Sequence, residues 1–374
     1  MQQPWQRMIF RAGAIALTIL NRFFYALVWF YSGLIGTWAV LRWIFADQIW
    51  WLGLVNALAL YLFLPLAILL PLAVLHAVGS ATLGKQLRSH PALGSAPKRT
   101  WWRSPLVALA IPLSIFSGFW GKQFIPPALK APPQQGTTFE VMTFNTLFNN
   151  QDTAKIVDML AETRPDILAL QEIHPKNRDA VLAALGDYPY SVYHPNTDKH
   201  TIGLVSRFPI LSAEPLVYPP LKRGLRVMLD INGEPLQVIV THLTPNLIKR
   251  QSWPQYIEDT EEWFDQRDRE MDLLTREIDS RSSPTLLLCD CNMTRTAQNY
   301  RDLSRHMTDG FHHTGWGLGW TVFHPAFSFP VVRFDYVWHT SELTVVRSYV
   351  GPDASSDHRP VGATVQFRHS HLAP

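Results

Sequence analysis

The sequence predicts an α/β protein: a sandwich of two packed sheets flanked by helices, preceded by an all-α membrane anchor of three transmembrane helices. Long uncharged runs occur before residue 122, whereas short β-type runs and a few helical stretches follow residue 136. Residues 1–131 carry eleven Lys or Arg and one acid, a net +10. The remaining 22 basic and 29 acidic residues give −7, which leaves +3 overall. This asymmetry excludes a single homogeneous soluble domain.

Three apolar runs predict that residues 1–121 form a membrane anchor. Residues 23–41 are nineteen residues without a formal charge, residues 49–78 are thirty, and residues 105–121 form a shorter third run. A helix needs about 20 apolar residues to span a bilayer. Buried core helices would carry polar residues on one face, and these runs show almost none. A cleavable signal peptide would have a shorter apolar stretch, without a second one following at once.

The basic residues predict the orientation of this anchor. Residues 79–104 carry five Lys or Arg and no acid, and Arg7 and Arg11 lie near the N-terminus. By the positive-inside rule, both regions face the cytoplasm. Three spans then place the rest of the chain on the outer side of the cell membrane. Residues 122–136 are rich in proline, so we expect a stiff linker to a domain over residues 137–374.

The domain over residues 137–374 is expected to consist mostly of short strands. Helices are expected over residues 152–162, with Asp152 as N-cap, and over residues 176–185 and 255–278. The expected strands cover residues 139–144, 166–170, 202–206, 236–241, 285–289, 333–338, 345–350 and 361–367. Many short strands with few helices favour a sandwich of two sheets.

Polar side chains follow these apolar strands repeatedly. Each one alone has an ordinary explanation, such as a turn former or a helix cap. Together they place carboxylate, amide and imidazole groups on one rim of the sheets, and such a rim suits Mg²⁺ or Mn²⁺. The residues are Asn145, Glu172, His242, Asp290, Asn292, Asp335, Asp357 and His358.

The same residues resemble the motifs of the endonuclease/exonuclease/phosphatase superfamily, whose fold is a DNase I-like four-layer α/β/β/α sandwich. The resemblance covers roughly residues 139–367. In the first half of this region, Asn145 matches the first-strand Asn, Glu172 matches the Glu of LQE, and Arg207 belongs to the S-R-x-P turn. His242 matches the T-H motif, and Asp290 and Asn292 match the D-x-N motif. Asp335 matches the Asp of R-I-D-Y, and Asp357-His358 matches the terminal S-D-H. No single motif is specific, but together, in the family's order and spacing, they are highly specific.

This resemblance implies a Mg²⁺-dependent hydrolase of phosphate ester bonds, with Mn²⁺ as the alternative cation. A cation next to the phosphate neutralises charge that would repel a nucleophile, and it acts as a Lewis acid. Glu172 matches the family's metal ligand. Asn145 and Asp357 are the further metal-binding residues that the resemblance implies.

The resemblance also implies the catalytic roles. His358, oriented by Asp335, and Asp290 would align and deprotonate the attacking water, because a carboxylate partner fixes an imidazole and keeps it basic. Which of Asp290 and His358 is the principal base stays open. Asn292 and His242 would donate hydrogen bonds to the phosphate oxygens as charge develops.

Arg207, Trp316 and Trp320 are candidates for substrate binding. Arg207 belongs to the S-R-x-P turn, and both tryptophans lie in the segment WGLGWTVFHP. Exposed aromatic side chains there would suit a lipid or a sugar-bearing substrate, whereas buried ones would be part of the core. The sequence leaves both interpretations of the tryptophans open.

The chain departs from the family at Cys289 and Cys291, which flank Asp290 where the usual motif is G-D-F-N. They are the only cysteines in the chain. Their spacing at a strand end would place the Cα atoms near the upper limit for a disulfide. We therefore interpret them as two small buried residues. A zinc site would need further ligands nearby, and the sequence shows none.

Three N-terminal spans, an outward domain and the segment GLGWT resemble the membrane-anchored bacterial VanJ-like branch of the superfamily. This branch implies hydrolysis of a phosphoester or phosphoanhydride bond of a phosphate-containing lipid at the outer membrane face, with the bilayer as partner. An extracytoplasmic nuclease is the alternative, but binding of nucleic acid usually needs a basic surface and this domain carries −7. A catalytically inactive scaffold would lack metal or base positions, and every one is present. The oligomeric state stays open.

Overall fold

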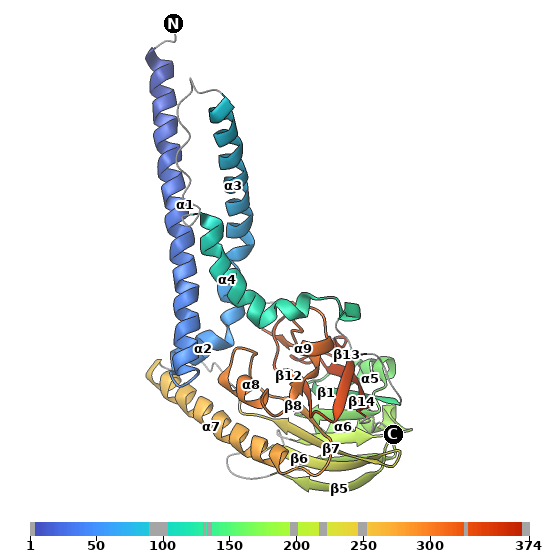
Figure 1. Ribbon diagram of the computed structural model, residues 1–374. Coiled ribbons are helices and arrows are strands. Elements are labelled where there is room, and N and C mark those ends of the chain that lie inside the picture. The colour runs from blue at the N-terminus through green and yellow to red at the C-terminus, as the bar shows by residue number, and fades with distance from the viewer. Residues whose placement is uncertain are drawn as a thin grey trace, which may run out of the picture. The chain divides into compact units, whose positions relative to one another are not determined.

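The chain forms two compact units in the computed structural model (Figure 1), which describes residues 4–89, 104–129, 132, 137–194, 201–216, 223–245, 253–324 and 328–368. One unit comprises Met1–Ala46 and Leu58–Phe119, and the other Asp47–Ala57 and Trp120–Pro374. Residues 90–103 of the basic loop lie outside the described residues. So do residues 130, 131 and 133–136 of the expected linker.

The first unit is helical. Its elements are α1 (Pro4–Phe45), η1 (Ala59–Phe63), α3 (Leu66–Ser89) and α4 (Pro105–Trp120). Three stretches are long and apolar enough to cross a membrane: Thr18–Phe45, Ala59–Thr82 and Pro105–Phe124. Large apolar side chains such as Phe30 and Ile68 are more than 60% exposed on these helices. Water-facing helices carry polar residues at such positions.

The uncharged run over residues 49–78 does not form the single helix that the sequence analysis expects. It is divided into α2 (Trp50–Ala57), η1 and the first half of α3. Pro65 stands at the last break, and its carbonyl accepts hydrogen bonds from the backbone N–H groups of Ile68 and Leu69. Proline has no N–H to donate and therefore begins a helix more readily than it continues one. The stretch that can span a membrane consequently moves to Ala59–Thr82.

The segment that contains α2 belongs to the second unit, because the carboxylate of Asp47 is bound there. Its Oδ1 accepts from Asn56 Nδ2 at 2.7 Å, and its Oδ2 accepts from the backbone N–H of Gln298 at 2.6 Å. Gln298 is the first residue of α8 (Gln298–Leu303), whose N-cap residue Ala297 has no capping side chain. Asp47 thus caps a helix that is 251 residues away in the sequence.

Close packing of α2 on α7 (Trp253–Asp279) holds this segment further. A Cβ atom at Gly53 would lie 2.7 Å from the ring of Phe264, so only glycine allows the helices to approach this closely. The hydroxyl of Thr296 also donates to the backbone carbonyl of Asn56.

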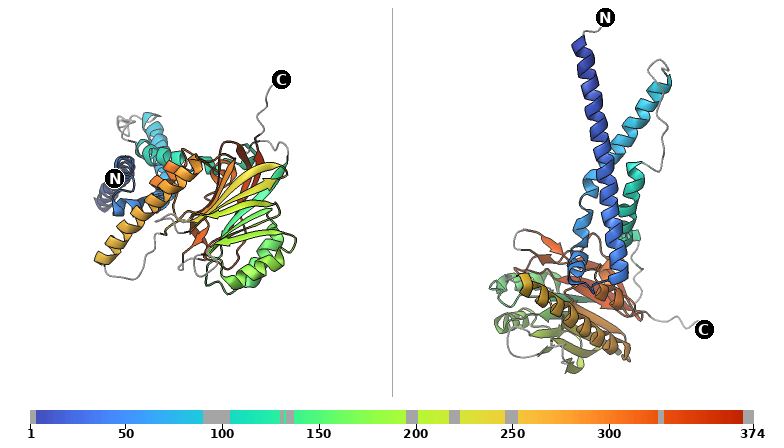
Figure 2. Two further views of the ribbon diagram at one scale, coloured as in Figure 1. Left: turned by 90° about the horizontal axis from the view of Figure 1, so that it is seen from below. Right: turned by 90° about the vertical axis from the view of Figure 1, so that its left-hand side faces the viewer.

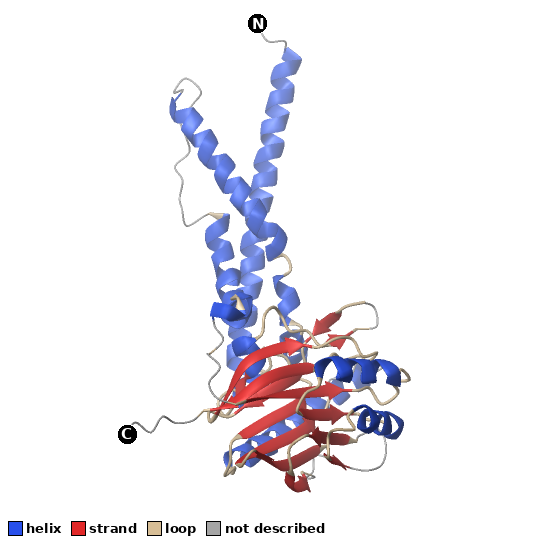
Figure 3. Ribbon diagram, turned by 90° about the vertical axis from the view of Figure 1, so that its right-hand side faces the viewer, coloured by secondary structure: helices blue, strands red, loops and turns tan. Residues whose placement is uncertain are grey.

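The rest of the second unit is a sandwich of two six-stranded sheets (Figure 3). The first sheet has the order β13 (Leu343–Val350), β14 (Val361–Phe367), β1 (Thr138–Asn145), β2 (Ile167–Gln171), β4 (Ile202–Ser206), β3 (Tyr190–His194). The second has the order β5 (Ile210–Pro215), β6 (Gly224–Ile231), β7 (Glu234–His242), β8 (Thr285–Asp290), β12 (Asp335–His339), β9 (Thr308–Asp309). A short ribbon pairs β10 (Val322–Phe323) with β11 (Pro330–Val332).

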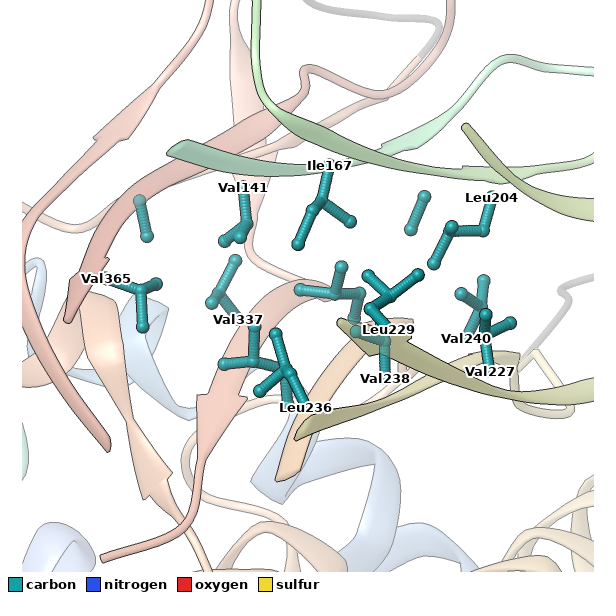
Figure 4. Packing of buried hydrophobic residues seen from close by; sticks show 14 of the residues in the cluster. Val141, Ile167, Leu204, Val227, Leu229, Leu236, Val238, Val240, Val337 and Val365 are labelled. Carbon is teal, nitrogen blue, oxygen red and sulfur yellow. The ribbon is translucent and has the colours of Figure 1, made fainter. Parts of the chain in front are cut away.

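The inner faces of the two sheets form one aliphatic core (Figure 4). Val141 and Ile167 of the first sheet face Val238 and Val337 of the second, and all four are at most 1% exposed. Alternate residues of each strand point inward, so branched aliphatic side chains at these positions interdigitate between the sheets. This core fixes the distance between the sheets and therefore the spacing of the residues at their rim.

Helices cover the outer faces of both sheets. On the first sheet lie α5 (Thr153–Thr163) and α6 (Pro175–Ala184), which bury a cluster that includes Met142 and Leu168. On the second lie α7 and α8, over a cluster that includes Ile239 and Leu287. Figure 2 shows α7 and the pair α5 and α6 on opposite sides of the strands. The order of layers is α/β/β/α, which confirms the expected fold.

The expected elements of this domain coincide with observed ones within two residues at either end. Asp152 caps α5 as expected, accepting from the backbone N–H of Lys155. The apolar pattern did not indicate β3, β5, β6, the three short strands β9 to β11, α8 and the five-residue helix α9 (Gly310–Thr314). Most of these are short or lie at a sheet edge, where apolar periodicity is weak.

Replacing Asp47 by alanine is expected to destabilise the second unit by about 1–2 kcal/mol, because the start of α8 loses its cap. For a unit of this size, the unfolding midpoint would fall by about 2–8 °C. Thermal unfolding of the full chain in neutral detergent, followed by tryptophan fluorescence, measures the change. Asp265→Ala, at an exposed position of α7, is the matched control and is expected to leave the midpoint unchanged. Equal midpoints for the two variants would contradict the capping role.

Candidate active site

Strand pairing brings the polar strand ends together at one rim. Parallel β1 and β2 place Asn145 opposite Gln171, and Glu172 follows directly. Parallel β7 and β8 place His242 opposite Asp290, and antiparallel β12 places Asp335 opposite the same residue. Because parallel neighbours end at the same edge of a sheet, polar residues at these ends meet. The rim is therefore formed by both sheets.

The carboxylate of Asp290 lies at the centre of this rim and is 1% exposed. Its Oδ2 accepts from Asn145 Nδ2 at 2.9 Å and lies 3.4 Å from His242 Nε2. Its Oδ1 accepts from the backbone N–H of Asn292 at 3.2 Å. His358 Nε2 lies 3.8 Å from Oδ2. Four of the residues expected at the site thus surround a single buried carboxylate.

His358 is held between two carboxylates. Its Nδ1 lies 2.8 Å from Asp335 Oδ2, on the side opposite the nitrogen that faces Asp290. Its backbone N–H donates to Ser356 Oγ, which in turn donates to the backbone carbonyl of Asn145. These bonds fix both the ring and the loop that carries it, as an acid–base group requires.

Burial and charge shift the pKa values of this group in opposite directions. Burial raises the pKa of Asp290 to about 7; the His358 charge opposes this and the Asp335 charge adds to it. Burial alone would lower the pKa of His358, but the carboxylates of Asp335 and Asp290 outweigh it and raise this pKa to about 10. The imidazole is thus held in its charged form, next to a carboxylate whose pKa is close to neutral pH.

Glu172 and His242 form a second pair on the rim, 3.6 Å apart between Oε1 and Nδ1. Arg223 NH1 also lies 3.1 Å from His242 Nδ1. Because an arginine can only donate, Nδ1 accepts, and Nε2 carries the proton that faces Asp290. Glu172 has a φ of 52°, an uncommon backbone conformation for a residue with a side chain. This backbone conformation ends the extended geometry of β2 at Glu172, and the Glu172 side chain is 25% exposed.

Sequence reasoning missed two arginines of the site. Arg223 lies beside His242, and buried Arg267 donates from NH1 to the backbone carbonyl of Asn292 at 2.7 Å. Asn292 itself has a φ of 47° and donates from Nδ2 to the carbonyl of Leu243. Neither arginine lies in a motif of the family or after an apolar strand, so no signal in the sequence marked them.

The side chains at the rim fit a divalent cation. Ligand atoms of Asp290, Asp335 and His358 lie within 4.8 Å of one another, and Glu172 adds a partly exposed carboxylate. Asp335 Oδ1 is buried and has no hydrogen-bond partner among the described residues. Such an oxygen calls for a water molecule or a cation beside it. Carboxylate and amide oxygens are the donors that Mg²⁺ and Mn²⁺ prefer.

Asp357 does not join this group of ligand atoms, because its side chain is exposed. Its backbone carbonyl instead accepts from the N–H of Phe323 in the short ribbon. The metal-binding role that the resemblance implies for Asp357 thus stays a prediction.

The structure does not bring Arg207 to the rim, because Arg207 lies at the other edge of the first sheet, and its substrate role stays a prediction. Its guanidinium pairs with Asp166 at 3.0 Å and stacks over the ring of Tyr188. Asp166 directly precedes β2, whereas Glu172 directly follows it. Asp166 and Glu172 are six residues apart along the strand direction, which separates the two edges by about 20 Å. Antiparallel pairing of β4 with β2 takes Arg207 away from the rim.

Trp316 and Trp320 lie on a loop that runs from the end of α9 towards the rim. Trp316 is 65% exposed, and Trp320 is partly buried. The carbonyl of Thr321, next to Trp320, accepts from the backbone N–H of Arg359, next to His358. Gly319 has a φ of 64°, and a Cβ atom there would lie 2.4 Å from Phe311, so the loop requires glycine. The substrate role of both tryptophans stays a prediction.

Cys289 and Cys291 form a disulfide, which corrects the interpretation of the pair as two separate small residues. Both are fully buried, as expected. Their Cα atoms are only 5.1 Å apart, well within disulfide range, because the strand ends at Asp290 and the chain turns before Asn292. The bridge spans Asp290 and fixes the backbone on both sides of the central carboxylate.

Solved structures with low sequence identity share this fold. An endonuclease/exonuclease/phosphatase from Bacteroides vulgatus is 16% identical, covering 62% of this chain and 100% of its own, with a TM-score of 0.51. Humanized TDP2 of D. rerio is 15% identical over the same shares, with a TM-score of 0.50. D. rerio TDP2 complexed with a single-strand DNA product gives the same identity, shares and score. No curated protein matches this chain in sequence.

The motifs of the sequence and the residues of the rim lie in a region of the chain that matches one family model. The model of the endonuclease/exonuclease/phosphatase family matches residues 142–358, which is more than half of the chain. The matched residues include every side chain that surrounds Asp290. The chain therefore belongs to the endonuclease/exonuclease/phosphatase family.

Proposed function

We propose that this protein is a membrane-anchored, divalent-metal-dependent phosphohydrolase that cleaves a phosphoester or phosphoanhydride bond of a lipid. Its family is one of phosphoester hydrolases, and the finer assignment is our proposal. One observation carries it: the buried group around Asp290 occurs in a chain with three helices that are long and apolar enough to cross a membrane. A tether of this kind confines the catalytic rim to the neighbourhood of the bilayer.

We assign the divalent cation to Glu172 and Asn145. Glu172 and Asn145 lie at the ends of neighbouring parallel strands and offer oxygen atoms at the same rim, and the Glu172 side chain stays partly exposed. Hard cations also prefer oxygen to imidazole ligands. When bound, the cation supplies charge neutralisation at the phosphate oxygens and Lewis-acid activation.

We assign different acid–base roles to His358, Asp290 and His242. His358 lies between the carboxylates of Asp335 and Asp290, which favour its imidazolium form. Its Nε2–H, which faces Asp290, would donate to a phosphoryl oxygen bound beside that carboxylate. Asp290 accepts the proton of the attacking water. His242, whose Nε2 carries a proton, donates towards the same centre. This geometry favours Asp290 over His358 as the principal base.

A lipid substrate fits the charge of the chain better than nucleic acid does. The part of the chain after residue 131 carries −7, whereas binding of nucleic acid is driven by basic groups that neutralise phosphates. The resemblance to the VanJ-like branch points to the same class of substrate. A nuclease remains the second candidate function, and the substrate comparison below separates the two.

The compact units constrain the number of membrane crossings, and the disulfide supports an extracytoplasmic position of the catalytic domain. Asp47–Ala57 follows the first candidate span and packs in the same compact unit as the residues after the third. Both segments lie on one side of a membrane only if the second and third spans both cross it or neither does. The Cys289–Cys291 disulfide is also typical of oxidising compartments.

With Mg²⁺ or Mn²⁺, the purified full chain is expected to release phosphate from undecaprenyl pyrophosphate or from phospholipids, and EDTA is expected to abolish the activity. Glu172→Ala is expected to lose most of it, because the cation loses a ligand. Glu162→Ala, at an exposed position of α5, is the matched control with unchanged activity. Cleavage of plasmid DNA without hydrolysis of any lipid phosphate would favour the nuclease.

Asp335→Asn is expected to lower kcat by about 100- to 10,000-fold with little change in KM, because His358 loses the carboxylate that orients and charges it. Steady-state phosphate release at several substrate concentrations separates the two constants. Asp179→Asn, at an exposed carboxylate of α6, serves as control. A normal kcat in Asp335→Asn would remove His358 and Asp335 from the proposed mechanism.

A reporter enzyme that is active only outside the cytoplasm is expected to be active when fused after Pro374. The same reporter fused after Ser89, at the end of α3, is expected to be inactive, because the basic loop faces the cytoplasm. Activity in the second fusion and not in the first would reverse the orientation and move the substrate to the cytoplasmic face.

A further inference from the structure

Four basic side chains gather in the second unit, and we name them the basic cluster: Lys122, Arg295, His312 and His313. Lys122 belongs to the short helix η4 (Gly121–Phe124), Arg295 to the loop after β8, and the histidines to α9. The helix η4 packs against α9, which brings the four together in the second unit (Figure 1). The cluster contains none of the residues that surround Asp290.

The contacts within the basic cluster fix which nitrogens carry protons. Lys122 Nζ lies 2.9 Å from His313 Nδ1, and Arg295 NH2 lies 2.9 Å from His312 Nε2. Charged lysine and arginine only donate, so these two ring nitrogens accept. The protons are then on His312 Nδ1 and His313 Nε2. The ring nitrogens of His312 and His313 that these two contacts do not use are therefore hydrogen-bond donors.

Arg295 and His312 each have one donor atom without an acceptor in the part of the chain that the structure describes. His312 Nδ1 and Arg295 Nε are buried and have no hydrogen-bond partner among the described residues. Arg295 makes no ion pair with a carboxylate in that part of the chain, and its NH1 donates to the hydroxyl of Tyr300. A buried donor without an acceptor is costly, so such a site favours a ligand that supplies acceptors.

The carboxylate that acts on the cluster is already engaged. Asp309 is buried, pairs with Arg333 and accepts from the hydroxyl of Tyr300. It also caps α9 by accepting from the backbone N–H of His312. Burial and the Arg295 charge lower the pKa of His312 to about 3, so its ring stays neutral at neutral pH. The negative charge of Asp309 is thus shared with Arg333, while Lys122 and Arg295 place two positive charges beside the histidines.

The basic cluster stands next to apolar side chains at the end of a candidate span. Lys122 lies in the last turn of the stretch Pro105–Phe124. Phe124 and Ile125 are 48% and 42% exposed, and Trp316 is 65% exposed. The backbone N–H of Gly317 donates to the carbonyl of Gln123, which ties the loop of Trp316 to η4. Aromatic and basic side chains together are typical of the headgroup region of a bilayer.

We propose that the basic cluster is a second anion site, which binds a phosphate group either on a membrane lipid or as free phosphate. Phosphate offers only acceptors and negative charge, so it complements a site of donors and positive charge. The proposal does not rest on the proposed function, because binding here requires neither the cation nor catalysis.

Binding of inorganic phosphate to the full chain in a neutral detergent, measured by calorimetry, tests the site. The titration contains EDTA, so that phosphate held by a cation at the catalytic rim does not contribute. Arg295→Ala and His313→Ala are each expected to weaken phosphate binding about tenfold or more. Arg305→Ala, an exposed arginine beyond α8, is the matched control with unchanged affinity. His313 is exposed, so its replacement is not expected to disturb folding.

Nanodiscs separate the two sources of phosphate. The full chain is placed in phosphatidylcholine with or without phosphatidic acid, and bound phosphatidic acid is measured after extraction. Enrichment that is lost in Arg295→Ala and kept in Arg305→Ala would identify a lipid phosphate as the ligand. Phosphate binding without such enrichment would identify free phosphate. Equal phosphate affinity in the wild type, Arg295→Ala and His313→Ala would overturn the proposal, as would absence of both phosphate binding and enrichment.

Discussion

The structure of the catalytic rim depends on one constraint: the carboxylate of Asp290 is buried and must be surrounded by donors. An isolated buried charge is so unfavourable that the fold would otherwise exclude it. Asn145 comes from the first sheet, His242 from the second, and His358 from the loop before β14. Since these elements meet only when the sandwich is closed, packing of the core and assembly of the site are a single event. The disulfide across Asp290 limits the movement of its backbone.

A second layer of contacts connects this rim to the segment between the first two candidate spans. Arg267 is buried and bonds the carbonyl of Asn292, and the charge of Asp47 acts on it together with those of Asp268 and Glu270. Asp47 in turn caps α8. The segment Asp47–Ala57 is therefore a structural part of the catalytic domain, and a domain cut out at residue 121 would lack it. This explains why a single acid occurs among the first 131 residues.

The sequence was most informative where structure follows from local patterns. The apolar runs over residues 139–144 and 285–289 form β1 and β8. They could be predicted because a buried strand requires apolar residues at alternating or successive positions of the sequence. The edge strand β5 went unnoticed, since four of its six residues are polar or small and all but Ile210 are exposed. The motifs indicated the rim, because polar residues that directly follow buried strands lie at the edge of the sheet. Position in a motif was insufficient for Arg207, since antiparallel pairing carries β4 in the opposite direction.

The sequence by itself thus determined the fold class, most of the longer strands and helices of the domain, the presence of three apolar stretches and the set of acids and amides at strand ends. These follow from the spacing of apolar residues, which is local information. Only the tertiary structure decided which polar ends share Asp290, that Cys289 bonds Cys291, that Asp47 caps α8 and that four basic groups meet around α9. Those contacts join residues as much as 251 positions apart, or depend on where a strand ends and turns. They are set by packing and strand pairing, which no local pattern encodes.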